Sequence, residues 1–356
     1  MVAVSKGRRL RLAAVLALLV AGSTPASAAA FTKAIWGPVY RNGVNQFPLY
    51  RTLGVGIDEA SVNWAEVAPT RPRHATDPTD PAYRWPLAIR QLVTQAKHYH
   101  VAVLLQLITT PRWANHGGAA NVPPINPWDY AAFAKAAARE FPSVHLWMIW
   151  GEPTRTANFS LTHPVAPGQA LTPAQQVAPH TYAQLLDDAY SQLKSVSARN
   201  LVLGGSTWSG GDIDTQQWIE NLRLPNGHRP RMDIYAHNPF SNVAPSFSVP
   251  FSARGIVQFS DLPELAGWID RYLRRGMPIF ISEFTIPTAI DQEFNFYVDP
   301  PVAAQWLTNA LRLSRHWKRI YGFGWIHVYD EPPVSNGGLL TVNGKPKLTY
   351  YAFQHG

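Results

Sequence analysis

The feature that most constrains the fold of this chain is a repeated alternation of apolar runs with amphipathic segments. Eight runs have the composition of buried strands, and we predict these strands near 34–39, 59–64, 101–107, 144–151, 201–206, 232–236, 278–283 and 322–328. Between them we predict helices near 85–98, 128–141, 181–197, 262–275 and 302–317. In the first of these helices, apolar residues such as Ile89, Leu92 and Ala96 recur at helical spacing. Weaker helical patterns lie near 46–53 and 350–353.

Strands that alternate with helices pair in parallel and connect by right-handed crossovers. Two architectures satisfy this rule, a closed eightfold barrel and an open doubly wound sheet. An open nucleotide-binding sheet usually has a glycine-rich turn after its first strand, but here the chain reads WGPVYRNGVNQF, without G-x-G-x-x-G. We therefore predict fold class α/β, as a single (β/α)8 TIM barrel. No linker divides the chain, so the barrel is expected to occupy residues 29–356 as one catalytic domain.

Residues 1–28 have the pattern of a signal peptide. Basic residues, from Lys6 to Arg11, precede an apolar stretch at 12–21, and Ala26-Ser27-Ala28 fits the small-residue rule for cleavage. The apolar stretch is shorter than the roughly 20 residues that a membrane span needs, which favours cleavage over the alternative of an uncleaved anchor. The protein is therefore expected to be secreted, to the extracellular, periplasmic or cell-wall side, with no membrane association after cleavage.

Composition argues against several classes of function. Without its first thirty residues the chain has 27 basic and 23 acidic residues, a net charge of only +4, and no long basic run. This gives little support to nucleic-acid binding. The chain has no cysteine, which excludes a thiol nucleophile and thiolate metal sites. It also lacks the G-x-S-x-G turn of serine hydrolases. No motif predicts a metal or a cofactor.

Two glutamates each follow an apolar run. Glu152 ends the segment HLWMIWGE, and Glu283 ends PIFISE, so in a barrel both lie on the C-terminal rim. A rim carboxylate with a structural role needs a cationic partner. Arg155 could serve Glu152, but no basic residue lies near Glu283 in the sequence. Two carboxyl groups that face each other across a mouth are what glycoside hydrolysis requires.

The segments WGEP and ISEF resemble the two signatures of clan A glycoside hydrolases, the cellulase and β-xylosidase-like superfamily of retaining barrel enzymes. The segments DIYAHNPF, GFGWIHVYDEP and GGLLTVNGKPKLTYYAF extend the similarity over most of the chain. The resemblance implies that Glu152 is the acid/base and Glu283 the nucleophile. One position departs from the pattern, because these enzymes usually have an asparagine before the acid/base, where it holds the sugar 2-hydroxyl. This chain has Gly151.

Other residues near strand ends are candidates for substrate binding. Aromatic faces stack on sugar rings, and the candidates are Trp64, Trp113, Trp208 and Trp325. The resemblance also implies a sugar-stacking tryptophan at Trp325, and the alternative for all four is the hydrophobic core. Polar candidates for binding a sugar hydroxyl or the nucleophile are Tyr235, His237, Asn238 and His327. A structural role is the alternative for His237.

These observations predict an exported, retaining glycoside hydrolase that acts on an oligosaccharide, a polysaccharide or a simple glycoside by a two-glutamate double displacement. Two alternatives stay open. Gly151 favours a carbohydrate-binding barrel that has lost turnover. A transglycosylase would use the same residues and transfer the sugar to another sugar in place of water.

Overall fold

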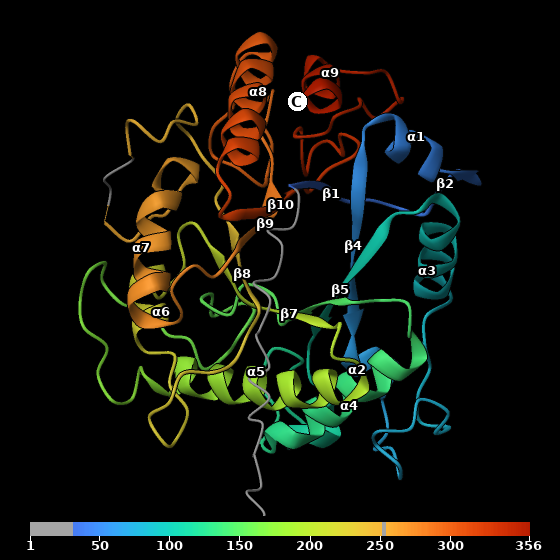
Figure 1. Ribbon diagram of the computed structural model, residues 1–356, viewed down its shortest axis with the longest axis vertical. Helices are drawn as coiled ribbons and strands as arrows, with labels where there is room; N and C mark the ends of the chain where they lie inside the picture. The colour runs from blue at the N-terminus through green and yellow to red at the C-terminus, as the bar shows by residue number, and fades with distance from the viewer. Residues whose placement is uncertain (1–30, 251–253) are drawn as a thin grey trace, which may run out of the picture.

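A computed structural model describes residues 31–250 and 254–356 as a closed barrel of eight parallel strands with helices between them (Figure 1). The predicted signal peptide, residues 1–28, lies outside the described residues. Around the barrel the strands are β1 (Thr32–Trp36), β4 (Val55–Asn63), β5 (Ala102–Ile108), β6 (Leu146–Ile149), β7 (Leu201–Trp208), β8 (Ile234–Asn238), β9 (Ile279–Phe284) and β10 (Ile320–Trp325), which closes on β1. The predicted (β/α)8 barrel is confirmed, and each predicted strand overlaps an observed one.

The helices lie outside the barrel wall (Figure 1). The predicted helices are confirmed as α1 (Phe47–Thr52), α3 (Leu87–Tyr99), α4 (Pro127–Glu140), α5 (Val177–Val196), α7 (Leu262–Tyr272), α8 (Pro300–His316) and α9 (Leu348–His355). Short elements were not predicted, because one turn gives no periodic pattern. They are α2 (Trp64–Val67), α6 (Thr215–Glu220), the 3-10 turns at Arg112–Ala114 and Phe259–Asp261, and a hairpin of β2 (Tyr40–Arg41) and β3 (Val44–Asn45). Within the described ranges, no helix is both long and apolar enough to cross a bilayer.

Side chains inside the barrel form a core separate from the larger one between strands and helices. The inner core consists of Ala34, Ile57, Leu104, Leu146, Met148, Leu203, Ile234, Ala236 and Phe280. Because successive strand residues point to opposite faces, residues two positions beyond these point into the C-terminal mouth. Gln106 follows Leu104 by two positions, and Asn238 follows Ala236 by two. The strand period therefore places polar groups where a barrel builds its site.

A β-bulge interrupts this alternation in β9. The two steps from Phe323 to Trp325 on β10 pair with three steps on β9, from Ile281 to Phe284. Both Ile281 and Phe284 belong to the outer core, so the two residues between them fall on the inner side. A bulge inserts one unpaired residue and redirects a side chain. The extra residue allows Glu283 to enter the mouth while Phe284 keeps its place under the helices.

Candidate active site

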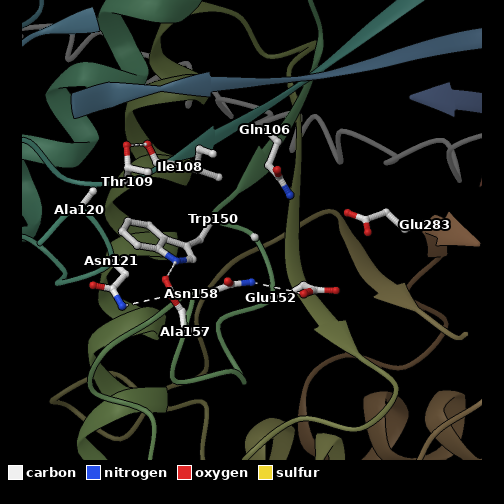
Figure 2. A pocket seen from close by; sticks show the side chains of 11 residues that line it. Gln106, Ile108, Thr109, Ala120, Asn121, Trp150, Glu152, Ala157, Asn158 and Glu283 are labelled. Carbon is white, nitrogen blue, oxygen red and sulfur yellow. Dashed lines mark hydrogen bonds between the residues drawn. The ribbon is translucent and has the colours of Figure 1, made fainter. Parts of the chain in front are cut away.

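Glu152 and Glu283 border one cavity of about 330 Å³ at the C-terminal ends of the strands (Figure 2). Gln106 from β5 and Asn158 from the loop after β6 also line it. The structure thus places the two glutamates together although 130 residues separate them in the sequence. Their shared cavity is the geometry that the sequence predicted for the two strand ends.

The backbone is strained where the chain leaves β6. Trp150 has a φ of +64° and Glu152 a φ of +45°, both in the left-handed region that side chains disfavour. Such a conformation costs about 1–3 kcal/mol per residue and tends to occur at functional sites, held by its surroundings. Here the Trp150 indole is buried and donates from Nε1 to the carbonyl of Asn158 at 2.9 Å. This contact fixes the turn that directs Glu152 into the cavity.

The carboxylate of Glu152 accepts hydrogen bonds from three side chains. Arg155 Nη1 donates to Oε2 at 2.7 Å, Asn158 Nδ2 to the same oxygen at 3.3 Å, and Asn238 Nδ2 to Oε1 at 2.9 Å. The Arg155 guanidinium also lies 4.5 Å from the centre of the Trp208 ring. A cation and two amide donors thus meet the two oxygens of this carboxyl group.

The surroundings of Glu283 act in the opposite direction. Burial raises the pKa of Glu283 well above its usual value, and the charges of Glu152 and Glu293 raise it further. Arg155 and the Asn238 amide lower the pKa but do not reverse the shift. Glu283 therefore keeps its proton to higher pH than an ordinary glutamate. The resemblance implies the reverse arrangement, with the proton on Glu152 and the charge on Glu283.

Two further acids, Asp58 and Glu59, are buried in β4, where Glu59 shares the inner face of the strand with Ile57 and Asp58 points to the opposite face. Burial raises the pKa of Glu59 well above its usual value, and the charges of Glu283 and Asp58 add to the shift. Glu59 fits only because β10 has a glycine beside it, since a Cβ on Gly324 would lie 2.4 Å from Glu59 Oε1. These residues were not predicted from the sequence, although two adjacent acids in an apolar strand are a visible signal.

Trp64 and Trp325 are fully buried, and the structure corrects their assignment as sugar platforms. Trp64 stacks on Phe133, with their ring centres 5.5 Å apart, and Trp325 packs edge-on against Phe284 and Phe353. These contacts lie in the core between strands and helices. A tryptophan at a strand end buries a large apolar area when it points outward to the helices, which explains the placement.

The other two tryptophans keep partial exposure. Trp113 donates from its indole to the carbonyl of Ala68 at 2.8 Å, and the Arg71 guanidinium lies 4.9 Å from its ring centre. It does not line the cavity of Glu152 and Glu283. Trp208 reaches that cavity indirectly, through the guanidinium of Arg155.

His237 and Tyr235 also point away from the mouth. His237 Nε2 lies 3.0 Å from the carbonyl of Val257, and because a carbonyl only accepts, Nε2 holds the hydrogen. Its Nδ1 then accepts from Thr207 Oγ1 at 2.8 Å, while the Tyr235 hydroxyl lies 3.2 Å from the same oxygen. Burial lowers the pKa of His237 to about 4. These contacts give His237 the structural role that was the alternative to substrate binding. Asn238, one residue later, faces Glu152.

A second cavity, of about 280 Å³, lies at the ends of β1 and β10 and includes His327 and Trp36. His327 Nε2 is 2.7 Å from a carboxylate oxygen of Glu293, the acid whose charge acts on Glu283. Trp36 donates from its indole to the carbonyl of Ser282 at 3.0 Å, next to Glu283. Trp36 was not predicted, although it ends the first strand, as other candidate tryptophans lie at or near the ends of theirs.

The structure also shows what lies beside Gly151, where the resemblance implies an asparagine. A Cβ built on Gly151 would be 3.0 Å from Nε2 of Gln106 and 3.3 Å from its Cδ. The amide of Gln106 therefore lies against the side of Gly151 on which a side chain would begin. Gln106 was not predicted, although it is the one polar residue in the strand AVLLQLI.

Comparison with known proteins relates the fold to glycosidases. No family model matches the chain, and no curated protein matches it by sequence. Among solved structures it is similar to a family 39 glycoside hydrolase from Bacteroides cellulosilyticus WH2, with a TM-score of 0.64, 17% identity, and coverage of 92% of this chain and 63% of that one. A monomeric beta-xylosidase from Caulobacter crescentus CB15 matches with a TM-score of 0.62 and 15% identity, over 91% of this chain and 67% of that one. A glucosidase from Croceicoccus marinus matches with a TM-score of 0.61 and 13% identity, over 92% of this chain and 67% of that one. The chain thus has the barrel fold of these enzymes and spans about two thirds of their length.

Proposed function

We propose that this protein is a glycoside hydrolase that cleaves O-glycosidic bonds with Glu152 and Glu283. The observation that supports this function best is the pair of carboxyl groups in one cavity at the barrel mouth, coupled so that the charge of Glu152 raises the pKa of Glu283. A pair that shares one proton supplies both an acid and a carboxylate at the same pH. The similarity to solved glycosidases supports the same class of reaction.

The proposed mechanism is a double displacement. A carboxylate oxygen of Glu283 forms a bond to the anomeric carbon as the bond to the leaving oxygen breaks, and Glu152 gives its proton to that oxygen. In the second step water attacks the same carbon, Glu152 takes a proton from the water, and the ester bond to Glu283 breaks. The sugar leaves with its original anomeric configuration, and both glutamates return to their starting states.

These roles require a rearrangement when the substrate binds. Glu283, whose pKa is raised by burial and by nearby acids, must react as the carboxylate, and Arg155 must release the Glu152 oxygen that the leaving group needs. The side chain of Arg155 is 39% exposed, so it has room to turn outward. In a second assignment, favoured by the Arg155 ion pair, Glu152 attacks and Glu283 serves as acid and base. Both assignments give the same overall reaction.

A screen of aryl glycosides tests the function. Xylosides, glucosides, mannosides and arabinosides would be offered to the wild-type protein, and released phenol would be measured. The matched control is the double variant Glu152→Gln and Glu283→Gln, which keeps both side-chain shapes and should release no phenol above background. NMR of the first-formed sugar should show retained configuration. Equal release by the wild type and the double variant would overturn the proposal.

We also propose export, from the pattern of residues 1–28. The expected cleavage lies between Ala28 and Ala29, or within two residues of it. Mass spectrometry of the protein recovered from the culture medium measures the new N-terminus. A mature product that retains Met1 would contradict export by cleavage.

A further inference from the structure

Gln106 lies within β5 with its side chain in the barrel mouth. It follows Leu104 of the inner core by two positions, so both point to the same face of the strand. It is 6% exposed and borders the cavity of Glu152 and Glu283. In Figure 2 its amide is turned toward the side on which the two carboxyl groups lie. A buried amide costs free energy unless its polar atoms are bound, so its partners matter.

The two ends of this amide are satisfied unequally. Ser61 Oγ donates to Gln106 Oε1 at 2.8 Å, a normal hydrogen bond. Within the described part of the chain, Nε2 has one partner, the thioether sulfur of Met148 at 3.6 Å. Such a sulfur is a weak acceptor and has no hydrogen to give, so the nitrogen is the end that faces it. The amide therefore has a second N–H hydrogen that a ligand in the cavity can accept.

Gly151 makes this position of the amide possible. A Cβ at residue 151 would lie 3.0 Å from Nε2 and 3.3 Å from Cδ of Gln106, tighter than most Cβ contacts, so the amide would have to shift by a few tenths of an ångström. A larger residue there would push the amide away. The donor group thus stands beside the residue that precedes Glu152.

We propose that Gln106 donates from Nε2 to the 2-hydroxyl of the sugar ring in this cavity. This inference rests on the proposed function, which puts the anomeric carbon between Glu152 and Glu283. A donor that borders the same cavity beside Gly151 lies next to that carbon, and the 2-hydroxyl is the hydroxyl on the neighbouring ring carbon. Gln106 is thus a substrate-binding residue that selects sugars with a free 2-hydroxyl.

The first test compares a glycoside with its 2-deoxy analogue. Gln106→Met keeps the length of the side chain but removes the donor. For the 2-hydroxy substrate, kcat/KM should fall about 10- to 100-fold, the effect of a hydrogen bond that strengthens in the transition state. For the 2-deoxy substrate, variant and wild type should agree within about threefold. Equal losses on both substrates would show a structural role and overturn the proposal.

The second test transfers the amide group from residue 106 to residue 151. Gly151→Asn alone should lower kcat/KM, because its side chain collides with Gln106. Combined with Gln106→Ala, the same asparagine has room to donate in place of the glutamine. The double variant should exceed Gly151→Asn in activity on the 2-hydroxy substrate, with little gain on the 2-deoxy one. A double variant no better than Gly151→Asn would contradict the shared position.

The two proposals fail in different ways. If the wild type releases no phenol from any glycoside, the hydrolase function is wrong. Calorimetric binding of the free sugars and their 2-deoxy forms then tests Gln106 directly. A wild-type preference for the 2-hydroxy sugar that disappears in Gln106→Met supports the contact, and a preference that persists contradicts it.

Discussion

The two sides of the barrel mouth differ in the charges that they offer to a carboxyl group. At the end of β6, Glu152 meets a guanidinium and two amide donors within hydrogen-bonding distance. At the end of β9, Glu283 is buried and lies near the acids Glu152 and Glu293. Two identical side chains in one cavity thus have opposite surroundings. Environment, more than residue type, decides which of them holds the proton.

The difference matters because the resemblance and the resting charges point to opposite roles. The resemblance makes Glu283 the attacking carboxylate, but burial and nearby acids raise the pKa of that group and so favour its protonated form. If the bound substrate displaces Arg155 from Glu152, Glu283 can attack as the resemblance implies. If Glu152 is the attacking group, Arg155 does not have to leave it. The four predictions below distinguish these cases, beginning with the largest expected effect.

Removing either carboxyl group should have the largest effect, and the two variants should fail at different steps. With a good phenol leaving group, Glu283→Ala should lose activity by about 10⁴-fold or more, because the attacking atom is gone. Glu152→Ala should form the glycosyl-enzyme and then stall, because no base activates water. Added azide should restore turnover in Glu152→Ala with retained configuration, whereas any azide product from Glu283→Ala should be inverted. NMR of the adducts gives the result, and the opposite pattern would assign the attack to Glu152.

Removing the cation should shift the pH dependence upward. Arg155 lowers the pKa of Glu283, so Arg155→Gln should raise that pKa further. If ionised Glu283 attacks, kcat/KM rises with pH through this pKa, and the acid limb should move to higher pH. If protonated Glu283 is the acid, the alkaline limb should move up instead. The pH profile of kcat/KM decides between them, and two unmoved limbs would show that Arg155 does not act on Glu283.

Removing a neighbouring acid should shift the same limb in the other direction. The charge of Glu293 raises the pKa of Glu283, so Glu293→Gln should lower it. The limb that moves up in Arg155→Gln should therefore move down in Glu293→Gln. Glu293 also contacts His327, so His327→Gln is the matched control for loss of that contact alone. A Glu293→Gln profile that coincides with its control would contradict the charge effect.

The smallest effect concerns stability rather than turnover. The pKa of Glu59 is raised in the folded protein, so the unfolded chain loses its proton first as pH rises. The contribution of Glu59 to stability is thus full below its unfolded pKa and declines above it. Glu59→Gln, which cannot ionise, should gain in Tm relative to the wild type as pH rises from about 4 toward neutrality, by about 2–4 °C for each kcal/mol. A Tm difference that does not change with pH would refute this account.

Sequence patterns were sufficient to predict the fold and the position of the two glutamates at one cavity, because strand and helix periods and strand-end carboxylates are local signals. The sequence did not predict as well whether other strand-end side chains point into the barrel or toward the helices. Trp325 and His237 stand near strand ends like Asn238, yet Trp325 packs in the outer core and His237 contacts Thr207 and Val257, whereas Asn238 donates to Glu152. Because successive strand residues point to opposite faces, an error of one position in the expected facing is enough to misplace a side chain. Gln106 and Trp36 were not predicted because their contacts with other strands depend on what lies across the barrel, which no local pattern contains.

The bulge in β9 also has an evolutionary consequence. Because a single surplus residue turns Glu283 inward while Ile281 and Phe284 stay under the helices, the barrel itself does not need that residue. An in-frame loss of one codon between Ile281 and Phe284 would restore ordinary strand pairing and leave one inward position where there were two. A gene lineage could thus abandon or regain the chemistry of this mouth in one step, with no change in the helices that cover the wall.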